Sequence, residues 1–153
     1  MQRIQTVCLI RHGEITQQKP RRFIGQSNIP LTGFGKSQMR RLREHLESFG
    51  VDRYFCSPLD RCVESASILA ERSEKEPEKI SAFAELSLGQ WEGLSVNEVK
   101  DRFPGSYEQR SRNIRSFRPL DGESFQDLQD RCWPVFETIV RKTVYCTAVV
   151  SHA

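Results

Sequence analysis

The chain has 153 residues, of which 37% are hydrophobic and 28% are charged, as is typical of one soluble globular domain. A formal net charge of +3 is too small to indicate a nucleic-acid partner. The sequence has no apolar run of membrane-spanning length and no signal-peptide core, and its five cysteines lack paired metal-ligand spacing, so a reducing, cytoplasmic setting is expected.

The first predicted strand ends at a group of polar residues. Residues Val7–Ile10 are apolar and rich in β-branched side chains, and Arg11, His12, Gly13 and Glu14 follow them directly. In open α/β sheets, ligands bind where the strands end at their carboxyl edge. A guanidinium and an imidazole beside a glycine that lets the backbone approach a ligand suit an anionic substrate. Ordinary surface charge at a turn is the alternative interpretation.

The next segment predicts a loop followed by a helix. Residues 15–28 are polar and are interrupted by a proline and a glycine, which is typical of a loop. Thr32 suits the N-cap of a helix that runs to about Phe49, and Gly50 suits its end.

A second strand and helix bring an arginine to the same predicted edge. Residues Val51–Cys56 predict a strand, and Ser57-Pro58 predict the N-cap and first position of a helix that runs to about Glu71. Arg61 lies in the first turns of this helix, where its guanidinium can bind two phosphate oxygens while helix N–H groups favour the anion. A surface arginine in a helical charge pattern is the alternative.

Glu85 is the candidate for a catalytic acid. It follows a short strand predicted at Ile80–Ala84, and it opens the aromatic, glycine-containing segment 85–93. Partial desolvation raises the pKa of a carboxyl group, which suits a proton donor, although a surface glutamate is the more common case. Trp91, in the same segment, is predicted to pack rather than to contact a ligand.

The remaining chain predicts two helices separated by a basic stretch. A short helix is expected at Val96–Phe103, and the basic residues Ser106–Pro119 are expected to cover the site. A long amphipathic helix is expected from Ser124 to about Lys142, with a kink at Pro134.

The last predicted strand, Tyr145–Val150, ends in Ser151-His152. If the first and last strands are parallel neighbours, His12 and His152 lie on one rim, whereas His45 lies in a polar helical stretch and is expected to be solvated. Strands that alternate with helices predict an α/β sandwich, with a largely parallel sheet between helical layers.

Several of these segments together resemble the histidine phosphatase superfamily, also called phosphoglycerate-mutase-like. The opening Arg-His-Gly-Glu signature is similar to residues 11–14, the Ser-Pro-Leu-x-Arg motif to 57–61, and the closing Ser-His-Ala to 151–153. Two further segments extend the resemblance through the whole chain. They are Gly-x-x-x-x-Pro-Leu-Thr at 25–32 and Glu-x-x-x-Gly-x-Trp-Glu-Gly at 85–93. It implies a three-layer α/β sandwich formed by a single domain over residues 1–153.

The resemblance also implies a reaction, the hydrolysis of a phosphate monoester through a phosphohistidine without a metal or another cofactor. His12 would be the nucleophile, Glu85 would donate and accept the proton, and His152 would help to stabilise the charge of the phosphoryl group. The other residues that would hold the phosphate are Arg11, Arg61 and Asn28.

Two alternatives belong to other functional classes. Cofactor-dependent phosphoglycerate mutases are longer and carry Glu-Arg-x-Tyr-Gly around the acid, whereas residues 85–89 are Glu-Leu-Ser-Leu-Gly, the pattern of phosphatase branches that include alpha-ribazole phosphatase. The turn at 121–125 also resembles alpha-ribazole phosphatases. A non-catalytic phosphate- or phosphoprotein-binding module would keep Arg11 and Arg61 but would tolerate the loss of Glu85. The presence of Glu85 argues against it, and the missing C-terminal segment argues for it.

Family members continue beyond the second histidine with a helix and further sheet, whereas this sequence ends at Ala153. The domain is therefore expected to lack that segment, and the terminal carboxylate is expected close to His152. The uncovered sheet surface would favour low stability or a homodimer. The other expected partner is a small phosphorylated metabolite, with neither nucleic acid nor membrane involved.

Overall fold

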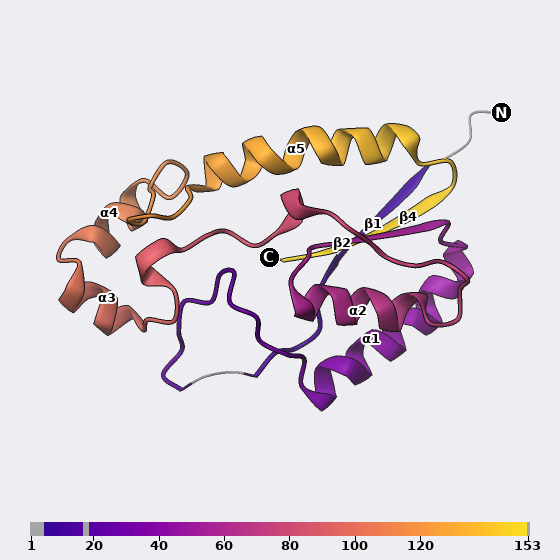
Figure 1. The fold of residues 1–153 in the computed structure, drawn as a ribbon, viewed down its shortest axis with the longest axis horizontal. Coiled ribbons are helices and arrows are strands. Elements are labelled where there is room, and N and C mark those ends of the chain that lie inside the picture. The colour runs from indigo at the N-terminus through magenta and orange to yellow at the C-terminus, as the bar shows by residue number, and fades with distance from the viewer. Residues whose placement is uncertain (1–4, 17–18, 153) are drawn as a thin grey trace. The chain divides into compact units, whose positions relative to one another are not determined.

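The computed structural model describes residues 5–16 and 19–152, which divide into two compact units (Figure 1). Of the described residues, 5–16, 28–84 and 135–152 form the first unit, and 19–27 and 85–134 form the second. Each unit has its own hydrophobic core. The described part of the chain, which the sequence predicts as one domain, therefore divides into two units that each have a core.

The first unit is built on a parallel four-stranded sheet in the order β1-β4-β2-β3. The strands are β1 (Thr6–Arg11), β2 (Arg53–Cys56), β3 (Glu78–Lys79) and β4 (Cys146–Ser151). Arg11 of β1 lies opposite Ser151 of β4, and Cys56 of β2 lies opposite Val150 of β4. The first and last strands are parallel neighbours as predicted, and the carboxyl ends of β1, β4 and β2 meet at one edge.

Helices lie on both faces of this sheet. On one face, α1 (Gly33–Leu46) and α2 (Asp60–Ala70) pack their apolar side chains against β2 and β4. On the other face lie the residues of α5 (Phe125–Lys142) that belong to this unit, 135–142 (Figure 1). There, Ile139 is buried and the Thr143 hydroxyl donates a hydrogen bond to Thr147 Oγ1 of β4 at 3.1 Å. The predicted sandwich with a largely parallel sheet between helices is confirmed.

The boundaries of α1 follow from its capping residues. Thr32 Oγ1 accepts a hydrogen bond from the Gly35 N–H at 2.9 Å, so Thr32 is the N-cap, as predicted. A 3-10 turn, η1 (Glu47–Phe49), follows the helix, and Gly50 ends it with a φ of 58°. This left-handed conformation is one that glycine adopts without a steric penalty.

Two local predictions are wrong. The helix predicted to start at Ser57-Pro58 begins at Asp60, and its N-cap residue is Leu59, whose side chain makes no capping hydrogen bond. Residues predicted as a strand at Ile80–Ala84 form a 3-10 turn, η2 (Ser81–Phe83). Their apolar side chains lie three residues apart, which matches the period of that turn rather than of a strand.

The second unit contains short helices around an aromatic core. Its elements are η3 (Gly89–Trp91), α3 (Val96–Arg102), α4 (Ser106–Arg112) and the part of α5 before Val135. Trp91 is 1% exposed, and its ring centroid lies 5.3 Å from the rings of Phe23 and Phe117. The prediction that Trp91 packs in the interior is confirmed.

The long helix α5 has the predicted extent and continues through Pro134, where the boundary between the two units falls. None of the helices among the described residues has both the length and the apolar character needed to cross a membrane.

Candidate active site

Two histidines meet at the carboxyl edge of the sheet in the first unit. His12 directly follows β1 and His152 directly follows β4, and the His12 N–H donates a hydrogen bond to the Ser151 carbonyl at 3.0 Å. The ring centroids of His12 and His152 lie 5.3 Å apart in an edge-to-face arrangement, with an interplanar angle of 62°. Parallel pairing in register therefore brings together two residues that are 140 positions apart in sequence.

The positive charges of both predicted arginines lower the pKa of His12. Arg61, in the first turn of α2, is 1% exposed, and Arg11 ends β1 with its side chain exposed. The Ser65 hydroxyl donates to the Arg61 carbonyl at 2.6 Å and accepts from the Gly13 N–H at 3.1 Å. This buried serine ties the first turns of α2 to the loop that carries His12.

The protonation state of His12 follows from its hydrogen bond. Its Nδ1 lies 2.7 Å from the Gly13 carbonyl oxygen. A carbonyl only accepts, so Nδ1 carries the proton and the neutral ring has its lone pair on Nε2. Burial lowers the pKa of His12 below its ordinary 6.5, and the charges of Arg61 and Arg11 lower it further, against the opposing effect of the Gly13 bond. The ring is therefore neutral near pH 7 and can act as a nucleophile.

The loop after His12 is fixed by close packing against the start of α1. A Cβ atom on Gly35 would lie 2.2 Å from the Glu14 carbonyl oxygen, so no larger residue fits there. The Thr32 hydroxyl donates to Glu14 Oε2 at 2.6 Å, and the Thr32 N–H donates to the Glu14 carbonyl at 2.9 Å. The last residue of the Arg-His-Gly-Glu segment thus has a structural role, which the sequence pattern did not reveal.

Asn28 lies beside the start of α2. Its exposed side chain accepts a hydrogen bond through Oδ1 from the Asp60 N–H at 3.0 Å. This contact places Asn28 next to the residue that precedes Arg61. A contact of Asn28 with substrate stays a prediction.

His152 is held by residues of the β2–α2 connection and of α2. Its Nε2 lies 2.8 Å from Ser57 Oγ and 3.5 Å from Cys62 Sγ, and both of these partners are 0% exposed. Sequence reasoning assigned Ser57 to a helix cap and Cys62 no role. The available signal was position, because Ser57 immediately follows a strand that ends at the same edge as β1 and β4.

Glu85 belongs to the second unit, whereas the other five predicted site residues belong to the first. Its carboxylate accepts a hydrogen bond from the Leu86 N–H at 2.8 Å. Its carbonyl accepts from Gln26 Nε2 at 2.9 Å and from Arg131 Nη2 at 3.1 Å. The backbone at Glu85 is thus well anchored within its unit, and its meeting with the two histidines stays a prediction.

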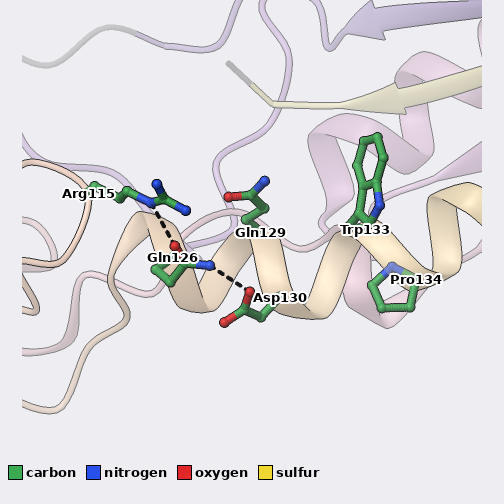
Figure 2. A pocket seen from close by; sticks show the side chains of 6 residues that line it. All are labelled: Arg115, Gln126, Gln129, Asp130, Trp133 and Pro134. Carbon is green, nitrogen blue, oxygen red and sulfur yellow. Dashed lines mark hydrogen bonds between the residues drawn. The ribbon is translucent and has the colours of Figure 1, made fainter.

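The second unit also has a surface pocket of about 240 Å³ along α5 (Figure 2). Arg115 Nε donates to Gln126 Oε1 at 2.7 Å, and Gln126 Nε2 donates to Asp130 Oδ1 at 2.7 Å. The other lining residues are Gln129, Trp133 and Pro134. None of the predicted site residues lines this pocket.

Comparison with known proteins identifies the family. The model of the histidine phosphatase superfamily (branch 1) matches residues 7–153. A Salmonella paratyphi A protein named "Probable phosphoglycerate mutase GpmB" is 33% identical over 125 residues, which are 82% of this chain and 58% of that protein. The chain belongs to the histidine phosphatase superfamily, and it spans 58% of the length of this curated relative.

Solved structures share the fold. YhfR from Bacillus stearothermophilus is 28% identical with a TM-score of 0.87, and the match covers 95% of this chain and 73% of that one. The alpha-ribazole phosphatase from Shigella flexneri is 24% identical, also with a TM-score of 0.87 and the same coverage. The expected resemblance to the superfamily and its phosphoglycerate-mutase-like fold is therefore confirmed, and the superfamily comprises enzymes of phosphatase or mutase type.

Proposed function

We propose that this protein is a phosphatase that hydrolyses a small phosphorylated metabolite through a phosphohistidine at His12. The observation that carries the proposal is the 2.7 Å contact of His12 Nδ1 with the Gly13 carbonyl, which leaves the lone pair of a neutral ring on Nε2. His12 lies opposite His152 and within the electrostatic influence of Arg11 and Arg61. A neutral imidazole is a competent nucleophile toward phosphorus, and a covalent intermediate divides one difficult displacement into two easier ones.

In the first step, His12 Nε2 forms a bond to phosphorus as the bond from phosphorus to the leaving oxygen breaks. Glu85, in its protonated form, gives its proton to that oxygen, and the alcohol departs. In the second step, Glu85 takes a proton from water as the water oxygen bonds to phosphorus. The bond to Nε2 then breaks, and inorganic phosphate leaves. Glu85 is thus acid and then base, and the enzyme returns to its starting state.

Phosphoryl transfer mainly requires alignment and stabilisation of the charge on the equatorial oxygens. Arg11 and Arg61 supply positive charge, and His152 supplies an N–H donor. Because the charges of two guanidinium groups act on the nucleophile, the proposal assigns this charge stabilisation to the protein, and turnover should persist in the presence of a chelator.

The test is to trap the intermediate. The protein is incubated with a labelled phosphate monoester such as para-nitrophenyl phosphate and quenched without acid, since phosphohistidine is stable to base and labile to acid. We expect label on His12 in the native chain and in His45→Ala, because His45 is an exposed histidine of α1 outside the site. Loss of turnover with retention of label in His12→Ala would contradict the proposal.

The curated relatives favour a second candidate, because they carry a phosphoglycerate mutase name. The Glu-Leu-Ser-Leu-Gly sequence at 85–89 favours the phosphatase. With 3-phosphoglycerate and a bisphosphoglycerate primer, a phosphatase releases inorganic phosphate, whereas a mutase isomerises the substrate without net release. We expect release, and efficient isomerisation would reverse the choice. Phosphate binding without turnover of any monoester would instead support a binding module.

A further inference from the structure

Ser57 occupies a position in the site that helix capping does not explain. It directly follows β2, and its backbone N–H donates a hydrogen bond to the Val150 carbonyl of β4 at 2.9 Å. Its side chain is fully buried. Its Oγ lies 2.8 Å from His152 Nε2, and it accepts a hydrogen bond from the Leu59 N–H at 3.3 Å. The backbone of two strands and the start of α2 therefore fix this hydroxyl against one nitrogen of the histidine.

The direction of the hydrogen bond can be deduced from the partners of the hydroxyl. A serine hydroxyl has one proton to donate, and a backbone N–H cannot accept it. Among the described residues, the partners of Ser57 Oγ are Leu59 N and His152 Nε2. Since a buried hydroxyl proton without an acceptor is unfavourable, the Ser57 proton points to Nε2. Nε2 must then hold a lone pair, and the ring proton must be on Nδ1.

We infer that Ser57 is a positioning residue that holds His152 as the neutral tautomer with its proton on Nδ1. His152 then carries its N–H on Nδ1 at a fixed ring orientation, with its ring centroid 5.3 Å from that of His12. The tautomer itself follows from the geometry of the first unit. Its catalytic consequence rests on the phosphatase reaction proposed above, where a positioned donor stabilises the charge on phosphoryl oxygens.

The first measurement needs no variant. The chain has three histidines, so two-bond nitrogen–proton correlations of their rings give a simple spectrum, and His45→Ala and His12→Ala assign it. At about pH 8, histidine rings with an ordinary pKa of about 6.5 are neutral. We expect the His152 pattern of a proton on Nδ1. A proton on Nε2, or protons on both nitrogens, would overturn the inference.

The second measurement tests the cause. Ser57→Ala should shift His152 toward the tautomer with the proton on Nε2, and Ser57→Thr, which keeps the hydroxyl, should restore the native pattern. Ser95→Ala is the matched control, because Ser95 is also a buried serine but caps α3 in the second unit. An unchanged His152 pattern in a folded Ser57→Ala protein would show that Ser57 does not set the tautomer.

The activity measurement separates this inference from the proposed function. Ser57→Ala should lower kcat about tenfold, the effect of one lost hydrogen bond, with a smaller change in KM, and Ser57→Thr should recover most of the loss. If the native chain shows the Nδ1 proton but hydrolyses no phosphate monoester, the proposed function fails and the positioning of His152 stands. If Ser57→Ala shifts the tautomer and leaves kcat unchanged, the positioning role in catalysis is overturned.

Discussion

Opposing interactions determine the pKa of His12. Burial and the charges of Arg61 and Arg11 disfavour the imidazolium, whereas the Gly13 carbonyl stabilises it through Nδ1–H. The net effect lowers the pKa below 6.5, so at a given pH a larger fraction of the nucleophile is neutral than in a free histidine. The same carbonyl that opposes the shift also directs the lone pair of the neutral ring to Nε2.

The first prediction is a titration. Followed by NMR, His12 should titrate below 6.5, and kcat/KM should fall with decreasing pH only below that value. Between the two pKa values the unfolded chain binds more protons than the folded one, so this group's contribution to stability is complete above about 6.5 and is lost as pH falls through the folded pKa. Arg11→Met should raise the pKa of His12. A pKa at or above the ordinary value in the native chain would refute the described electrostatics.

A second prediction concerns Arg61. Its side chain is buried and its charge acts on the nucleophile, and loss of one charge-stabilising donor typically lowers kcat by about 10²–10³. Arg61→Gln should therefore lose about this factor in monoester hydrolysis. Arg40→Gln is the control, because Arg40 is an exposed arginine of α1. Full activity of Arg61→Gln would exclude the assigned role.

At the scale of elements, the N-terminus of α1 is linked to the catalytic loop through one side chain. Thr32 Oγ1 accepts from the Gly35 N–H as the N-cap and donates to the Glu14 carboxylate, which lies two residues after His12. Thr32→Ala should thus destabilise the protein by about 2 kcal/mol, with about 1 from the lost cap and about 1 from the lost hydrogen bond.

Urea unfolding of Thr32→Ala measures this loss. Ser37→Ala is the control in the same helix, since its exposed hydroxyl donates to the Gly33 carbonyl, and it should change stability by less than about 0.5 kcal/mol. Equal stability of the two variants would contradict the role given to Thr32.

Elements with strong local signals could be predicted from sequence, and elements without them could not. The strands β1 and β4 are short apolar runs, and α1 and α5 carry clear helical periodicity, so their existence followed from pattern alone. The helix α4 was missed because its seven residues are almost entirely polar. At the site, His12 and His152 could be predicted to share one edge because each directly follows a strand, and Arg61 because it lies in the first turn of the helix after β2. Ser57 was assigned to a helix cap because its hydroxyl suits that role, although its position directly after β2 was a signal for the site, and the fold brings it to His152.

At the scale of the whole molecule, ligand binding should couple to unfolding. The first unit contains Arg11, His12, Arg61 and His152, which are four of the predicted site residues. Inorganic phosphate that binds these residues should therefore stabilise the folded chain. At a phosphate concentration one hundred times Kd, the gain is about 2.7 kcal/mol. Calorimetry should show a melting temperature that rises with phosphate concentration. A chloride salt at the same ionic strength should not raise the melting temperature. A melting temperature of Arg61→Gln that rises with phosphate as in the native chain would contradict the predicted site.

The division into two units was not predictable, for a physical reason. The second unit combines residues 19–27 with 85–134, and its core comes from loops and short helices rather than from one periodic segment. Local patterns identify single elements but do not show which distant loops share a core.

The distribution of tryptophan in the chain has a practical consequence. Both tryptophans, Trp91 and Trp133, belong to the second unit, and they are 1% and 53% exposed. Intrinsic fluorescence excited at the indole absorption band therefore arises from residues of the second unit, and the unit that carries His12 and His152 contributes no emitter. Iodide should quench the emission of Trp133 and spare that of Trp91, so two distinct emitters sense the surface and the interior of the same unit. A chemical or optical label placed in the first unit would supply the missing signal.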